Sequence, residues 1–118
     1  MKYIYLLYGD ESKMPAPDSP EFTQVLEAYG AFSAEVEAAG VYVAGEPLED
    51  SPTASTVSVR QGQRTISDGP FAETKEQLGG FYILDCKDLD EALSYAAKIP
   101  AAHVGHVEVR PIMSIPGA

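Results

Sequence analysis

The chain has 118 residues, enough for one domain with a single hydrophobic core. Its 18 acidic and 8 basic residues give a formal net charge of −10, which repels nucleic-acid phosphates and anionic lipids, so neither is expected as a partner. No apolar run is long enough to span a bilayer or to form a secretory signal. The one cysteine, Cys86, excludes an internal disulfide and fits a cytoplasmic location.

The first half of the chain predicts a strand, a helix and a second strand. Residues 2–8 are apolar on both alternating faces, which is typical of a strand covered on both sides. Ser19 and Pro20 suit the start of a helix, and apolar residues then recur at helical spacing until Gly40. Residues 41–44 predict the next strand.

The second half predicts a hairpin, then a strand, a helix and a final strand. The hairpin turns at a Gln-Gly pair, and the following strand is again apolar on both faces. The expected ranges are 55–60 and 63–67 for the hairpin, 81–86 for the strand, 88–99 for the helix, 104–112 for the segment holding the last strand, and 113–118 for a loose tail.

This order predicts an α+β fold, a ferredoxin-like β-α-β-β-α-β domain with an inserted β-hairpin. Both helices would then cover one face of an antiparallel sheet. The strands at 2–8 and 81–86 would carry apolar side chains on the other face as well. A second copy packed sheet to sheet would cover them, so a homodimer is expected; the alternative is that the inserted hairpin and the C-terminal tail cover them.

Residues 67–81, Ser-Asp-Gly-Pro-Phe-Ala-Glu-Thr-Lys-Glu-Gln-Leu-Gly-Gly-Phe, resemble the signature of the DGPF-domain branch of the YCII-related family. Residues 8–11, 44–48 and 100–111 contain further matching pieces. The resemblance implies a single domain over residues 1–118 that forms a dimeric α/β barrel. It also implies a small bacterial cytoplasmic protein, in some cases encoded beside or fused to a sigma factor.

Other YCII-related proteins carry a His on the first helix that is paired with an Asp as a proposed acid–base dyad. The corresponding position here is Tyr29, so the chain departs from the dyad pattern. Tyr29 lies on the apolar stripe of the helix, where it is either a core residue or a hydroxyl that needs a partner. Asp68 could supply that partner.

Asp68 precedes Gly-Pro, where a carboxylate can accept N–H bonds from its own turn. The alternative is a general base at the mouth of a cleft. Glu46, at the end of a strand, is either a solvated charge or the partner of Asp68. We expect Asp68 to point inward, within reach of Tyr29 or Glu46.

Phe71 and Arg110 are the candidate substrate-binding residues, although an ion pair is the default role for Arg110. His103 and His106 have no further ligand at a matching spacing, so neither a metal site nor an organic cofactor is expected.

The sequence leaves two candidate functions open. One is small-molecule binding with cofactor-free acid–base chemistry of the isomerase or lyase type, carried by Asp68, Tyr29 and Glu46. The other is a non-enzymatic regulatory or interaction module that acts with a sigma factor.

Overall fold

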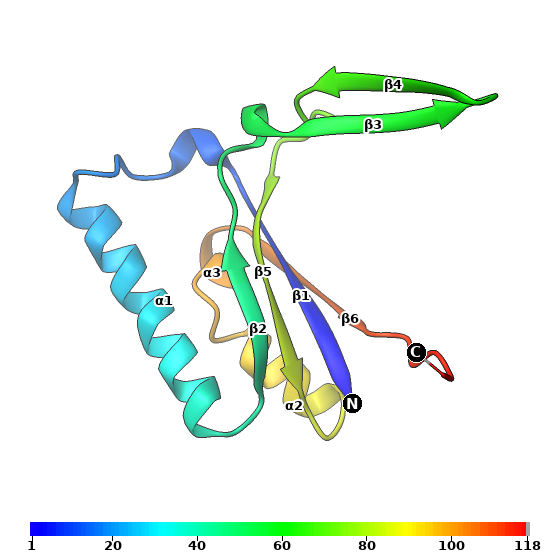
Figure 1. Ribbon diagram of the computed structural model, residues 1–118. Coiled ribbons are helices and arrows are strands. Elements are labelled where there is room, and N and C mark those ends of the chain that lie inside the picture. The colour runs from blue at the N-terminus through cyan, green and yellow to red at the C-terminus, as the bar shows by residue number, and fades with distance from the viewer. Residues whose placement is uncertain (118) are drawn as a thin grey trace.

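A computed structural model describes residues 1–117 of the chain. Four strands form one antiparallel sheet in the order β2-β5-β1-β6, and two more pair as a separate hairpin (Figure 1). The helices pack on one face of the four-stranded sheet, so the predicted α+β class is confirmed. The strands are β1 (Lys2–Gly9), β2 (Tyr42–Pro47), β3 (Ser55–Arg60), β4 (Gln63–Asp68), β5 (Gln77–Asp85) and β6 (His106–Pro111), and the helices are α1 (Pro20–Ala38), α2 (Leu89–Ala96) and α3 (Ala101–Val104).

The start of α1 is the predicted one. Ser19 is its N-cap, and the Ser19 Oγ accepts a hydrogen bond of 3.2 Å from the N–H of Phe22. Pro20 occupies the first helical turn, where its missing N–H costs no helical bond.

No helix among residues 1–117 is both long enough and apolar enough to cross a membrane.

Two boundaries differ from the prediction. β5 begins at Gln77 rather than at residue 81, so its paired glycines lie inside the strand. Gly80 is needed there because a Cβ at this position would lie 3.0 Å from the backbone oxygen of Glu46 on the neighbouring strand. The predicted helix 88–99 ends at Ala96, and the chain continues in a tighter turn in which the N–H groups of Lys98 and Ile99 donate to the backbone oxygens of Tyr95 and Ala96.

The alternation along β1 assigns its side chains to two faces of the sheet. Tyr3, Tyr5 and Leu7 are buried beneath the helices, in the core of the molecule. The opposite side, which we call the helix-free face, carries partly exposed apolar side chains at its centre. These are Ile4, Leu6, Tyr8, Phe81 and Ile83.

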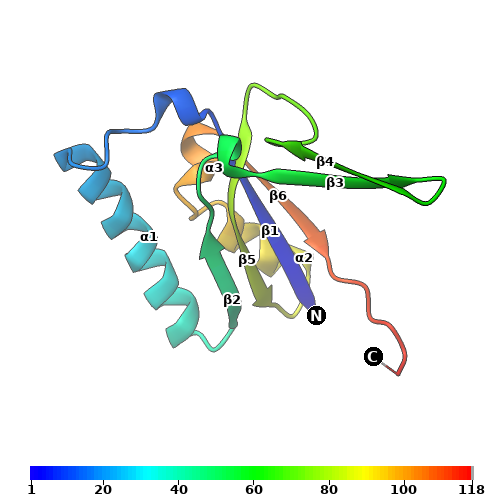
Figure 2. The ribbon, with the colours of Figure 1, turned by 45° about the horizontal axis from the view of Figure 1, so that its top comes forward.

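The hairpin does not cover the helix-free face. Its strands β3 and β4 pair with each other and project beyond the four-stranded sheet (Figures 1 and 2). The C-terminal segment after β6 also runs away from the sheet (Figures 1 and 2). It has no helix or strand over residues 112–117. Position 118 of the predicted tail lies outside the described residues. The alternative in which these segments cover the face of their own chain is therefore wrong.

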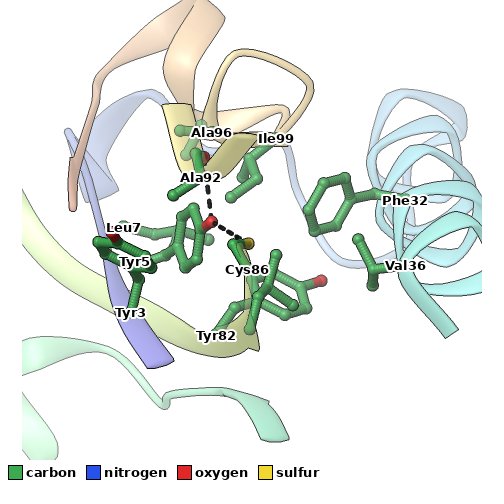
Figure 3. Close-up of a cluster of buried hydrophobic side chains, with 12 residues drawn as sticks. Tyr3, Tyr5, Leu7, Phe32, Val36, Tyr82, Cys86, Ala92, Ala96 and Ile99 are labelled. Atoms are coloured by element: carbon green, nitrogen blue, oxygen red, sulfur yellow. Dashed lines mark hydrogen bonds between the residues drawn. The ribbon is translucent and has the colours of Figure 1, made fainter. Parts of the chain in front are cut away.

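Tyr5 is the largest fully buried side chain of the core. Its hydroxyl donates a 3.0 Å hydrogen bond to the backbone oxygen of Ala92 on α2 and lies 3.7 Å from the Cys86 Sγ (Figure 3). Burial raises the pKa of Tyr5 far above its ordinary value, and the neighbouring Cys86 raises this pKa further. The phenol is therefore neutral in the folded protein even in alkaline solution.

We expect the free energy of unfolding to fall as the pH rises above about 10, the ordinary pKa of tyrosine. Above this pH the unfolded chain loses the Tyr5 proton and the folded chain keeps it, so each further pH unit costs about 1.4 kcal/mol. Urea titrations at several pH values test this. Tyr5→Phe should cost about 1–3 kcal/mol at neutral pH, because the Ala92 oxygen loses its partner, and should flatten the alkaline slope. Equal slopes in the two proteins would contradict the prediction.

Candidate functional site

A cleft opens between α1 and the β2–β5 side of the sheet, on the face covered by helices. Its volume is about 260 Å³, and its lining is mainly apolar. The polar groups of its side chains are chiefly hydroxyls, those of Tyr29, Ser33, Tyr42 and Tyr82, so we call it the tyrosine cleft. Since an apolar cavity of about 150 Å³ holds benzene, this cleft has room for one substituted ring.

Tyr82 is held in place by contacts on several sides. Its hydroxyl lies 3.1 Å from the Ser33 Oγ, within hydrogen-bond distance, and its ring packs edge-on against Phe32 with the ring centres 5.1 Å apart. The ring also lies over Gly45 of β2, where a Cβ would approach its Cδ1 to 2.6 Å. The missing side chain at Gly45 therefore makes the space that the ring and the cleft occupy.

Tyr29 lies on α1 one turn before Ser33, so both side chains face the same side of the helix. Burial raises the pKa of Tyr29, the nearby Tyr82 raises this pKa as well, and the backbone N–H of Ala101 acts in the opposite direction. The Tyr29 phenol is therefore neutral at pH 7. It can donate a hydrogen bond or a proton to an oxygen atom in the cleft, and it is not a base there.

Glu46 supplies the one carboxylate among the residues that line the cleft. It is exposed, and its backbone pairs with Phe81. Because paired residues point to the same side of a sheet, its side chain shares the helix-free side with Phe81, whereas Gly45 and Tyr82 face the cleft. Tyr29 and the backbone of Glu46 thus border one cleft, while the Glu46 carboxylate lies on the other side of the sheet.

Asp68 is not near either of them. It is the last residue of β4, paired with Ser55, and it is exposed. It lines a second and more open hollow of about 1060 Å³ at the base of the hairpin. Within residues 1–117 its carboxylate accepts no hydrogen bond from the following turn or from across the fold. The expected approach to Tyr29 or Glu46 is therefore wrong, because β4 ends at the base of the hairpin, where Asp68 lines a hollow separate from the tyrosine cleft.

The two candidate substrate-binding residues also lie apart. Phe71 is 89% exposed and lines the hollow that contains Asp68. Arg110 lies on β6, outside both depressions, and forms an ion pair with Glu108 in which its Nη2 is 2.7 Å from the carboxylate. The ion pair is the default role expected for Arg110.

The role of Glu11 was not predicted from the sequence. Its carboxylate accepts hydrogen bonds from the Ser51 N–H at 2.6 Å and from the Ser51 hydroxyl at 2.8 Å. Its own N–H donates to the Gln77 side chain at 2.9 Å. Glu11 thus joins the segment before the hairpin to the strand after it. The only indication in the sequence was that Glu11 lies in residues 8–11, which contribute to the resemblance to the YCII-related family.

The two histidines have separate partners. The His103 Nε2 lies 2.9 Å from the Ala97 backbone oxygen, and the His106 Nδ1 lies 2.8 Å from the Glu76 carboxylate. Over residues 1–117, no group of three or more His, Cys, Asp or Glu side chains is placed to hold a metal ion.

The fold and the cleft define a small α+β domain with a mainly apolar cleft that has room for one ring. The model of the YCII-related domain matches residues 1–116, and the chain belongs to this family, as predicted. An uncharacterised protein of Rhizobium meliloti (strain 1021) is 40% identical over 114 residues, which are 95% of this chain and 92% of that protein.

Among solved structures, the chain is similar to the 5-chloro-2-hydroxyhydroquinone dehydrochlorinase TftG of Burkholderia phenoliruptrix in complex with 2,5-dihydroxybenzoquinone. The similarity covers 96% of this chain and 94% of that one, with a TM-score of 0.47 and 19% sequence identity. The reaction and the bound quinone are properties of that enzyme.

Proposed function

We propose that the protein binds a small single-ring molecule in the tyrosine cleft and that Tyr29 donates a hydrogen bond to an oxygen atom of this molecule. The observation that carries the proposal is the neutral, partly buried phenol of Tyr29 beside an apolar cleft of about 260 Å³. Apolar walls with a few placed polar groups are the usual composition of a ligand site. The fixed hydroxyl of Tyr82 supports a second contact.

This arrangement supports cofactor-free proton transfer of the isomerase or lyase type. A neutral phenol in an apolar site stabilises negative charge that develops on a ring oxygen, because it donates without needing to be reorganised. Glu46 borders the cleft through its backbone, and its carboxylate lies on the helix-free side with Phe81, so no carboxylate of the described residues faces the bound ring. In this proposal Tyr29 is the acid, and neither Glu46 nor Asp68 acts on the bound ring.

Thermal unfolding in the presence of phenol, hydroquinone, benzoquinone and benzoate tests ligand binding. A compound at 100 times its dissociation constant should add about 2.7 kcal/mol to the free energy of unfolding. Tyr29→Phe keeps the ring but removes the donor, so it should weaken binding by roughly 0.5–1.5 kcal/mol.

Tyr95→Phe is the matched control, because Tyr95 lies on α2 and does not line the cleft. It should leave the ligand response unchanged. The proposal is wrong if none of the four compounds stabilises the wild-type protein, or if Tyr29→Phe responds to them as the control does.

We further propose that the protein acts as a homodimer in which a second copy covers the helix-free face. The support is the apolar strip formed by Leu6 and Phe81 and their neighbours, which no element of the same chain covers in residues 1–117. Contiguous apolar surface of this kind is typical of protein interfaces.

A further inference from the structure

The hairpin β3–β4, which we call the arm, has few ties to the rest of the molecule. Its two strands pair over six residue pairs, from Ser55 with Asp68 to Arg60 with Gln63, and share no sheet with the other strands. It projects beyond the four-stranded sheet in both views (Figures 1 and 2). The radius of gyration is 16.4 Å, whereas a compact chain of this length has about 13.5 Å. The arm therefore extends the molecule without adding to its core.

One face of the arm is apolar. Val57, Val59 and Ile66 share this face, since Val57 pairs with Ile66, and they are 57%, 55% and 56% exposed. The opposite face carries polar side chains, among them Thr65. Such alternation is typical of a strand pair with one buried face. Yet each of these three residues remains more than half exposed within residues 1–117.

We propose that in the homodimer the apolar face of the arm lies on the helix-free side of the second copy. This inference rests on the homodimer of the proposed function and deepens it. An arm of six residues is about 20 Å long, whereas a sheet of four strands is about 14 Å across, so the arm can cross the face fully. Each chain has both surfaces, so two equal contacts form around a two-fold axis and no surface remains open for further copies.

One basic residue of the arm and one acidic residue of the helix-free face could pair between copies. Arg64 pairs with Val59 and so lies on the apolar face of the arm, and Glu46 shares the helix-free side with Phe81. Neither Arg64 nor Glu46 forms an ion pair within residues 1–117. An ion pair between Arg64 of one copy and Glu46 of the other would fix the register of the docked arm.

The docked arm also changes the surroundings of Asp68. Asp68 lies two residues after Ile66 and therefore on the same face of the arm. In a single chain its carboxylate is exposed, and in the dimer it faces the second copy. The hollow that Asp68 lines is thus bordered by the second copy in the proposed dimer.

The variants Ile66→Glu and Thr65→Glu test the inference. They place the same charge at adjacent exposed positions on opposite faces of β4. Sedimentation equilibrium of the full chain gives the dimer dissociation constant, and circular dichroism checks the fold. Ile66→Glu should raise this constant roughly tenfold or more, and Thr65→Glu should change it by less than about threefold.

The outcomes distinguish a failure of the proposed docking of the arm from a failure of the proposed homodimer. A wild-type protein that stays monomeric at high concentration overturns both the homodimer and the docking of the arm. A dimer that tolerates both substitutions equally, or is weakened equally by both, overturns the docking of the arm and leaves the homodimer standing.

A second measurement does not depend on the folding of Ile66→Glu. A photo-crosslinking residue, p-benzoylphenylalanine, replaces Ile66 in one protein and Thr65 in another, and each is mixed with ¹⁵N-labelled chains. Position 66 should yield crosslinks between a labelled and an unlabelled chain that map to β1, β5 or β2, and position 65 should not. Crosslinks confined to one chain would overturn the inference.

Discussion

Gly105→Ala should lower the free energy of unfolding by roughly 3 kcal/mol or more. Gly105 lies between α3 and β6, and a Cβ at this position would lie 2.1 Å from the backbone oxygen of Tyr8 and 3.1 Å from the Cα of Gly9. Both of these atoms belong to the backbone of a central strand, so they cannot turn away as a side chain can. The methyl group can be accommodated only if β6 moves away from β1, next to the pair Tyr8 and His106.

Urea unfolding followed by circular dichroism measures this loss. Gly9→Ala is the control, because a Cβ at Gly9 would meet nothing within 4 Å. The control should change the free energy of unfolding by about 0.5 kcal/mol or less. Equal free energies of unfolding for Gly105→Ala and Gly9→Ala would contradict the prediction, because the backbone around Tyr8 would then accommodate the methyl group without loss of stability.

Gly45→Ala should lower the free energy of unfolding by about 1–3 kcal/mol and also weaken ligand binding in the tyrosine cleft. The added methyl would lie 2.6 Å from the Cδ1 of Tyr82, so the ring has to shift. A shifted ring loses its contact with Phe32 and the 3.1 Å approach of its hydroxyl to Ser33. The effect on the cleft is therefore larger than the volume of one methyl group.

Gly30→Ala provides the matched comparison. Gly30 borders the same cleft from α1, and a Cβ there would meet nothing within 4 Å. Because alanine favours a helix more than glycine does, this variant should gain about 0.5–1 kcal/mol. Chemical denaturation of both variants and thermal shifts with the ring compounds provide the test. A Gly45→Ala protein as stable as the wild type would contradict the prediction.

The elements were predictable where local chemistry decides them. The Ser19 cap, the apolar spacing of α1 and the Gln-Gly turn each depend on neighbouring residues, and the structure has all three. The early start of β5 was not predictable. Gly79 and Gly80 suggest a turn by themselves, and only the close approach of β2 to Gly80 explains them as strand residues.

The candidate site was only partly predictable for a related reason. Tyr29 and Glu46 were selected, and both line the tyrosine cleft. Tyr82 was not selected, because its strand is apolar on both faces and its contact with Ser33 joins residues 49 positions apart. The placement of Asp68 depends on the direction in which the hairpin leaves the sheet, and no local pattern in the sequence encodes that direction.

The pairing of β1 with β5 and β6 has a consequence for the order of folding. Residues at the start of the chain pair with residues more than 80 positions later, as in Lys2 with Asp85 and Tyr3 with Pro111. Closing such long loops is entropically costly, and topologies rich in distant contacts fold slowly. During synthesis at about 5–20 residues per second, β1 has no partner strand until most of the chain has emerged from the ribosome. For those seconds, an apolar strand with two unpaired edges is open to chaperones and to aggregation.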